Sequence, residues 1–72
     1  MITQEQRRRL ERERNSLEKL YKLQSEKVAW IREALIIETD PLRKFQYEHQ
    51  IQEDECTLKE LDDKLSEIEN QL

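Results

Sequence analysis

The sequence predicts an all-α fold in which two long helices form an antiparallel hairpin of the coiled-coil type. Three observations lead to this prediction. The chain has no glycine and one proline, and 42% of its residues are charged while 35% are hydrophobic. That composition is typical of long helices or coiled coils. Apolar residues recur at helical spacing on both sides of Pro41, which itself interrupts the pattern. Disorder is the alternative at this charge level, but regular spacing favours helices.

The first helix is expected over about residues 3–38. Thr3 and Gln6 have the spacing of a capping box, which predicts a helix start near residue 3. Apolar positions then step by alternating four and three residues, which is the periodicity of a coiled coil. The predicted seam residues on this helix are Leu10, Leu17, Tyr21, Gln24, Val28, Ile31 and Leu35.

The turn is expected at about residues 39–40, and the second helix at about 41–71. Pro41 pushes the preceding residue out of the helical region, and it suits the first position of a new helix with Asp40 as its N-cap. The chain therefore reads as one domain, a single helical hairpin over residues 1–72. The predicted seam residues on the second helix are Ile51, Asp54, Leu58, Leu61, Leu65 and Ile68.

Folding back at the turn places residues opposite each other when their numbers add up to about 79. Gln24 then meets Asp54 in a polar layer within the apolar seam. Polar residues at such positions fix the register of coiled coils at some cost in stability. Arg14 interrupts the stripe nearer the chain ends, where its stem is expected to extend over Leu65.

The two halves of the chain carry opposite charge. Residues 1–36 hold nine Lys and Arg against six Asp and Glu, a balance of +3, and residues 37–72 hold four against eleven, a balance of −7. An antiparallel hairpin is expected to bring the arginines of the first helix beside the acidic end of the second. The residues concerned are Arg7, Arg8, Arg9 and Arg12 on one side, and Asp62, Asp63, Glu67 and Glu69 on the other.

A second set of apolar residues lies away from the seam. On the first helix Leu23, Trp30 and Ile37 sit roughly 100° or more from the seam centre, and Leu20 bridges the gap to the seam; on the second helix the set lies almost opposite the seam. It predicts a docking face, most simply for a second copy in a four-helix bundle, or else for another helical domain. The plainer alternative is that these residues thicken the hairpin near its turn. The set comprises Leu20, Leu23, Trp30, Ile37, Leu42, Phe45, His49 and Cys56.

Several classes of function are excluded or disfavoured. Phosphate-binding loops and nucleophile elbows need glycine, and no apolar run is long enough to cross a bilayer. Cys56 is the only cysteine, so we expect a reduced cytoplasmic protein without membrane partners.

His49 and Cys56 are separated by about 10.5 Å along a helix, too far for one chain to bind a single metal ion through both. A rod also lacks a cleft for paired carboxylates, so no enzyme and no cofactor is expected.

The arginines between Arg7 and Arg14 raise nucleic acid as an alternative partner, since they could contact phosphates. Glutamates interrupt the run, the net charge is −4, and no aromatic residue lies nearby for stacking. We therefore do not expect nucleic-acid binding. A passive coiled-coil spacer inside a longer protein is a third possibility.

The turn region also carries a family resemblance. The stretch Ala34-Leu35-Ile36-Ile37-Glu38-Thr39-Asp40-Pro41, followed by Lys44-Phe45, Glu48, Gln50-Ile51 and the Leu58-Leu61-Leu65-Ile68 heptads, is similar to short α-hairpin segments of multidomain bacterial proteins, especially cyanobacterial ones. Those segments accompany caspase-like, TIR or STAND-NTPase modules and are grouped as effector-associated domains. The resemblance covers about residues 17–70. It implies a non-enzymatic adaptor that links an effector to its regulator by homotypic association.

Overall fold

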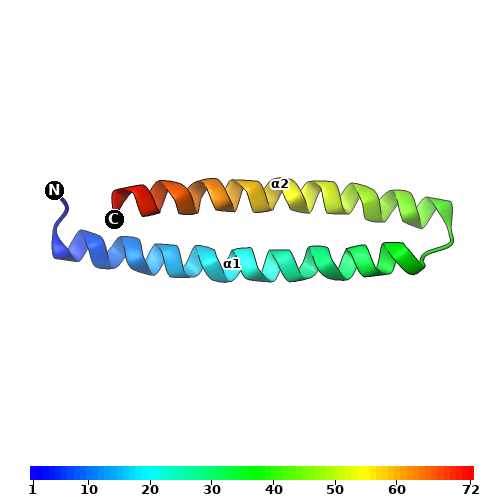
Figure 1. Cartoon of the computed structure of the whole chain (residues 1–72), viewed down its shortest axis with the longest axis horizontal. Helices are drawn as coiled ribbons and strands as arrows, with labels where there is room; N and C mark the ends of the chain where they lie inside the picture. The colour runs from blue at the N-terminus through cyan, green and yellow to red at the C-terminus, as the bar shows by residue number, and fades with distance from the viewer.

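Two long α-helices lie side by side and antiparallel in the computed structural model, which describes all residues from 1 to 72 (Figure 1). Helix α1 spans Gln4–Ile37 and helix α2 spans Pro41–Gln71. The chain termini meet at one end of the rod, here called the open end, and the turn forms the other end (Figure 1). The rod extends 56 Å along its longest axis and has a radius of gyration of 16.7 Å. A compact domain of this length would have a radius of about 11 Å. The predicted all-α hairpin is thus confirmed.

Helix α1 begins where the capping box predicts. The Thr3 hydroxyl accepts a hydrogen bond from the backbone N–H of Gln6 at 3.1 Å, and the Gln6 side chain accepts one from the N–H of Thr3 at 2.9 Å. These two bonds satisfy donors that a helix start leaves unpaired. Thr3 is therefore the cap, and the helix proper starts one residue later than expected.

The turn is built by side chains of acidic residues. Helix α1 ends at Ile37, because Glu38 takes an extended backbone conformation with φ −76° and ψ 133°. The Glu38 carboxylate accepts hydrogen bonds from the N–H groups of Thr39 and Asp40, both at 3.1 Å. Asp40 then caps α2 by accepting from the N–H of Leu42 at 3.0 Å, with Pro41 in the first turn. No residue of the chain has a positive φ, which explains how the turn forms without glycine.

The seam between the helices contains the small core. Its only buried residues are Val28, Ile51, Asp54 and Ile68. Tyr21 is the outlier of the predicted seam, with 36% of its surface exposed. The remaining predicted seam residues are half-buried: Leu10, Leu17, Gln24, Ile31, Leu35, Leu58, Leu61 and Leu65.

Three polar side-chain contacts join the helices: the third, between Arg32 and Glu55, links residues whose numbers add up to 87, and the other two report the register more closely. A guanidinium nitrogen of Arg7 donates to the backbone carbonyl of Leu72 at 3.3 Å, and Lys27 Nζ donates to Asp54 Oδ1 at the same distance. The residue numbers of these pairs add up to 79 and 81, close to the sum predicted for a tight fold-back.

The polar layer of the seam has a different composition from the one the sequence predicts. Asp54, only 4% exposed, accepts hydrogen bonds from Lys27 Nζ and from Gln50 Nε2, the latter at 3.0 Å, and none from Gln24. Gln24 is half-buried in the seam, but it makes no hydrogen bond to Asp54. The flexible four-carbon stem of Lys27 lets an ammonium from the flank of α1 reach the buried carboxylate. The second oxygen of Asp54, Oδ2, is buried without a hydrogen-bond partner.

Candidate functional site

The apolar side chains predicted to form a docking face all lie exposed on the hairpin. Their exposed fractions run from 52% for Leu20 to 81% for Ile37, with Trp30 at 78%. The seam does not cover them, so they do not thicken the core near the turn. We refer to the predicted set as the docking face: Leu20, Leu23, Trp30 and Ile37 on α1, with Leu42, Phe45, His49 and Cys56 on α2.

On α1 the docking face includes a shallow hollow. It is lined by Leu23, Glu26, Lys27, Trp30 and Ile31, three of which are hydrophobic. The side chain of Lys27 lines this hollow and its Nζ atom contacts Asp54. Its methylene stem therefore lies among the apolar side chains, while its ammonium belongs to the polar layer. Sequence reasoning missed this role of Lys27; its spacing of seven residues from Leu20 and Ala34 was the available signal.

On α2 the docking face carries an aromatic pair. The rings of Phe45 and His49 stack with centroids 6.4 Å apart and an interplanar angle of 5°. The His49 Nε2 atom lies 3.2 Å from Glu53 Oε1, one helical turn further on. Cys56 is a free, exposed thiol. No group of three or more histidine, cysteine or acidic side chains is placed to hold a metal ion.

Ile36 also exposes a large apolar side chain, although it does not belong to the docking face. It is 81% exposed, equal to its neighbour Ile37. The two residues point about 100° apart around α1. This pair therefore offers a matched comparison between a position on the docking face and one outside it.

The arginine cluster near the open end lies beside the C-terminal end of α2, as expected, and Arg7 contacts the carbonyl of Leu72. No ion pair, however, joins Arg7, Arg8, Arg9 or Arg12 to the acidic residues of α2. The two ion pairs that cross the seam are Lys27–Asp54 and Arg32–Glu55, both nearer the middle of the rod. Opposite net charge of two helices does not by itself place individual side chains within reach. Sequence reasoning also missed the pair that Arg32 forms.

The side chain of Arg14 is half-buried. Its side chain is 34% exposed, as expected for a stem that lies against the seam, and its Nε atom is 4.0 Å from Glu18 of the same helix. That nitrogen is buried without a hydrogen bond.

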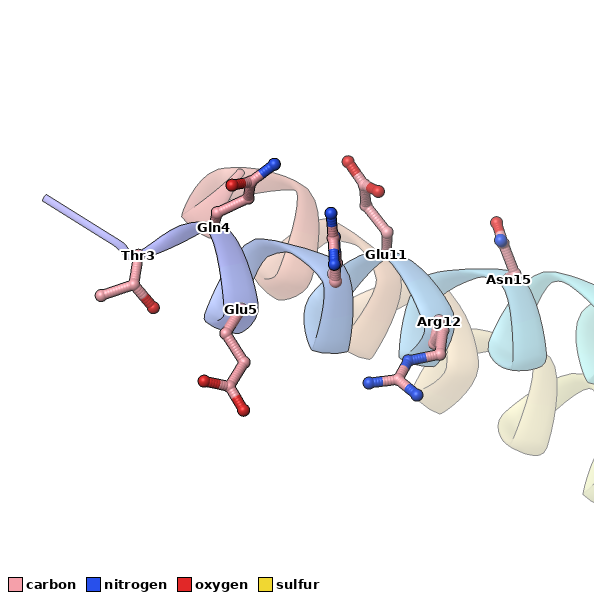
Figure 2. A pocket seen from close by; sticks show the side chains of 7 residues that line it. Thr3, Gln4, Glu5, Glu11, Arg12 and Asn15 are labelled. Atoms are coloured by element: carbon pink, nitrogen blue, oxygen red, sulfur yellow. The ribbon is translucent and has the colours of Figure 1, made fainter.

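The first turns of α1 carry polar side chains that surround no enclosed site. The hollow there has no hydrophobic lining and involves Thr3, Gln4, Glu5, Arg8, Glu11, Arg12 and Asn15. Figure 2 shows that Glu5 and Arg12 project to one side of the helix, whereas Gln4, Glu11 and Asn15 project to the other. These side chains therefore do not point toward one common point.

Neither helix combines the length and the apolar character that a bilayer-spanning segment needs. Comparisons with protein-family models, with curated proteins and with solved structures find no match to this chain.

Proposed function

We propose that the chain is a non-enzymatic interaction module that self-associates through its docking face. The observation that carries this proposal is the exposure of six large apolar side chains, between 52% and 81%, on a protein whose core buries only three. Complete burial of such a side chain stabilises by about 1.5–3 kcal/mol. Six that are roughly two-thirds exposed would therefore gain about 1–2 kcal/mol each when covered. The six are Leu20, Leu23, Trp30, Ile37, Leu42 and Phe45.

A second copy of the chain is the occupant that we propose, giving a four-helix bundle. Helical hairpins with an apolar face beyond the seam commonly pair in this way, and a twofold dimer is the commonest closed assembly. Each copy offers apolar side chains on both helices, so two copies can cover one another without a further partner. Association must exceed a cost estimated at about 4–15 kcal/mol, which the summed gain of two docking faces can do.

The adjacent isoleucines provide the test. Sedimentation equilibrium from micromolar to millimolar concentration should show a dimer for the wild type. Ile37→Ala should weaken the dimer, because a side chain of the docking face is lost, whereas Ile36→Ala should leave the dissociation constant unchanged. The two variants remove the same atoms from sites with equal exposure. A wild-type mass of one chain at millimolar concentration, or equal effects of the two variants, would refute the proposal.

We further propose that this association brings an effector together with its regulator in the cytoplasm. The support is the resemblance of the turn region to adaptor hairpins of bacterial signalling proteins, together with the two-helix architecture. Two halves of a split reporter, each fused to one hairpin, should regain activity with wild type and Ile36→Ala but lose it with Ile37→Ala. A reducing compartment suits the free Cys56 thiol. Labelling of Cys56 in intact cells by a membrane-impermeant maleimide would contradict the cytoplasmic placement.

Nucleic acid is the second candidate, and one observation favours it. Arg7, Arg8, Arg9 and Arg12 are exposed and form no ion pair with a carboxylate. If they bind phosphates, the affinity for a fluorescent RNA or DNA should fall linearly with salt on logarithmic axes, with a slope near −0.7 to −0.9 for each phosphate contact. Replacing Arg7, Arg8 and Arg9 with Glu should abolish that binding. Anisotropy that stays flat at low salt would exclude this candidate.

A further inference from the structure

A second set of positions with coiled-coil spacing runs along α1, apart from the seam with α2. Its members follow one another at alternating intervals of three and four residues, which is the repeat that packs one helix against another. At 100° per residue, the set is centred about 100° around α1 from the seam. We call this set the second seam; it consists of Leu20, Leu23, Lys27, Trp30, Ala34 and Ile37.

The hairpin leaves the second seam uncovered. Ala34 is half-buried, and every other member is exposed. Three of the members, Leu23, Lys27 and Trp30, line the shallow hollow on α1. A helix with two packing stripes about 100° apart can contact two neighbouring helices, as each helix does at the corner of a four-helix bundle. One of these neighbours is α2, and a single hairpin does not supply the other.

The same stripe on a second copy is the partner that fits the second seam. Contact between identical stripes is isologous, so each copy returns every contact that it receives and the assembly closes at two chains. From Leu20 to Ile37 the stripe is about 25 Å long, at 1.5 Å per residue. On α2 no stripe outside the seam is equally apolar. Beyond Phe45 the positions at the corresponding spacing are His49, Gln52, Cys56 and Lys59.

Lys27 is the only charged member of the second seam, and it lies in the middle of the stripe. Its side chain is 52% exposed, so a helix docked on the stripe would remove water from it. A lysine covered in an apolar seam costs stability unless its charge is paired.

The partner of Lys27 lies inside the hairpin. The Nζ atom of Lys27 donates to Oδ1 of the buried Asp54 at 3.3 Å. Gln50 Nε2 donates to the same oxygen at 3.0 Å, which holds the carboxylate in place. Asp54 is therefore positioned to compensate the ammonium of Lys27 when a second helix covers the lysine stem.

We propose that α1 of a second copy packs along the second seam, and that Asp54 permits this contact by neutralising Lys27 from within the hairpin. This proposal rests on the self-association proposed above. It adds the pair of helices at the centre of the contact and a positioning residue, Asp54, that is not itself on the docking face. The polar layer then serves two interfaces, one between the helices of a hairpin and one between copies.

Two alanines of α1 test where the contact lies. Ala34→Glu places a carboxylate in the second seam, whereas Ala29→Glu places one on an exposed position outside both seams. Glutamate is a good helix former, so both variants should keep the helix content seen by circular dichroism. In sedimentation equilibrium, Ala34→Glu should raise the dissociation constant about a hundredfold or more, because an unpaired charge is buried. Ala29→Glu should leave the constant unchanged.

A double-mutant cycle tests the role of Asp54. Asp54→Asn keeps the shape of the side chain but removes its charge, so the dissociation constant should rise about tenfold or more. Asp63→Asn removes the same charge from an exposed site without an ion pair, and should have no effect. Adding Lys27→Met to Asp54→Asn removes the unpaired ammonium and should restore dimers at least as tight as those of the wild type.

The outcomes separate this proposal from self-association itself. A dimer that weakens with Ala34→Glu and follows the cycle supports both proposals. A dimer that Ala34→Glu and Ala29→Glu affect equally, or that Lys27→Met does not restore, overturns the packing proposed here and leaves self-association intact. A wild-type monomer at millimolar concentration overturns both.

Discussion

Trp30→Ala is the substitution that probes the docking face most directly. Trp30 is 78% exposed in the hairpin, so its indole contributes little to the seam. An aromatic side chain buries about 150–250 Å² when it is fully covered. Part of the Trp30 side chain is already covered within the hairpin, and an alanine would keep some of the remaining contact. Trp30→Ala therefore removes about 100 Å² of contact area from the dimer interface. At about 25 cal/mol for each Å², the loss is about 2.5 kcal/mol per site.

A symmetric dimer contains this site twice, so the total loss is about 5 kcal/mol. Because 1.4 kcal/mol corresponds to a tenfold change, the dissociation constant should rise more than a thousandfold. Adding Phe45→Ala, at a site that is 66% exposed, should leave only monomers at accessible concentrations. Circular dichroism of dilute monomer should show the same helix content as the wild type, because neither side chain is part of the core.

The assay uses the protein's own fluorophore. Trp30 is the only tryptophan, so its emission should shift to shorter wavelength as the wild type is concentrated and the indole leaves water. Sedimentation equilibrium then gives the dissociation constants of the wild type, Trp30→Ala and the control Ile36→Ala. A Trp30→Ala constant within threefold of the wild-type value, or an emission maximum that does not change with concentration, would refute the argument.

Three further outcomes follow from the same structure. If folding and association are linked, the thermal midpoint should rise with protein concentration from micromolar to millimolar, and an unchanged midpoint would separate the two processes. Asp54→Leu should raise the urea midpoint, since replacing a buried charged group with a well-packed apolar one often stabilises by about 1–4 kcal/mol, whereas Lys27→Met should lower it by leaving the carboxylate without its cation. A lower midpoint for Asp54→Leu would show that the carboxylate stabilises the seam.

The fold could be read from the sequence because its signals are local. The capping box at Thr3 and the Asp40-Pro41 pair fix where the helices begin, since each acts through hydrogen bonds or sterics within one turn. The seam follows from heptad spacing, and every predicted seam residue except Tyr21 is buried or half-buried. A helical wheel is sufficient for these features because it gives the direction of each Cα–Cβ bond.

The polar contacts could not be read in the same way. A wheel does not give the position of a charged group at the end of a long, flexible stem. Lys27, on the flank of α1, therefore reaches Asp54 in place of Gln24, which occupies the seam position. For the same reason Arg7 donates to the carbonyl of Leu72 and pairs with none of the nearby carboxylates. Exposed ion pairs gain too little free energy to impose their geometry on side chains in water.

Isolated exposed hydrophobic residues are ordinary on protein surfaces, and Ile36 is an example that needs no explanation. The docking face differs because three of its members, Leu23, Trp30 and Ile37, recur every seven residues on one side of α1. A two-helix seam constrains only the positions that face it, so residues outside it are free to be polar. Apolar side chains retained at such positions cost solubility without adding to the core, which holds only Val28, Ile51 and Ile68 as apolar members. Periodicity outside the seam is therefore the property that a second helix pair would account for and that a solitary hairpin would not.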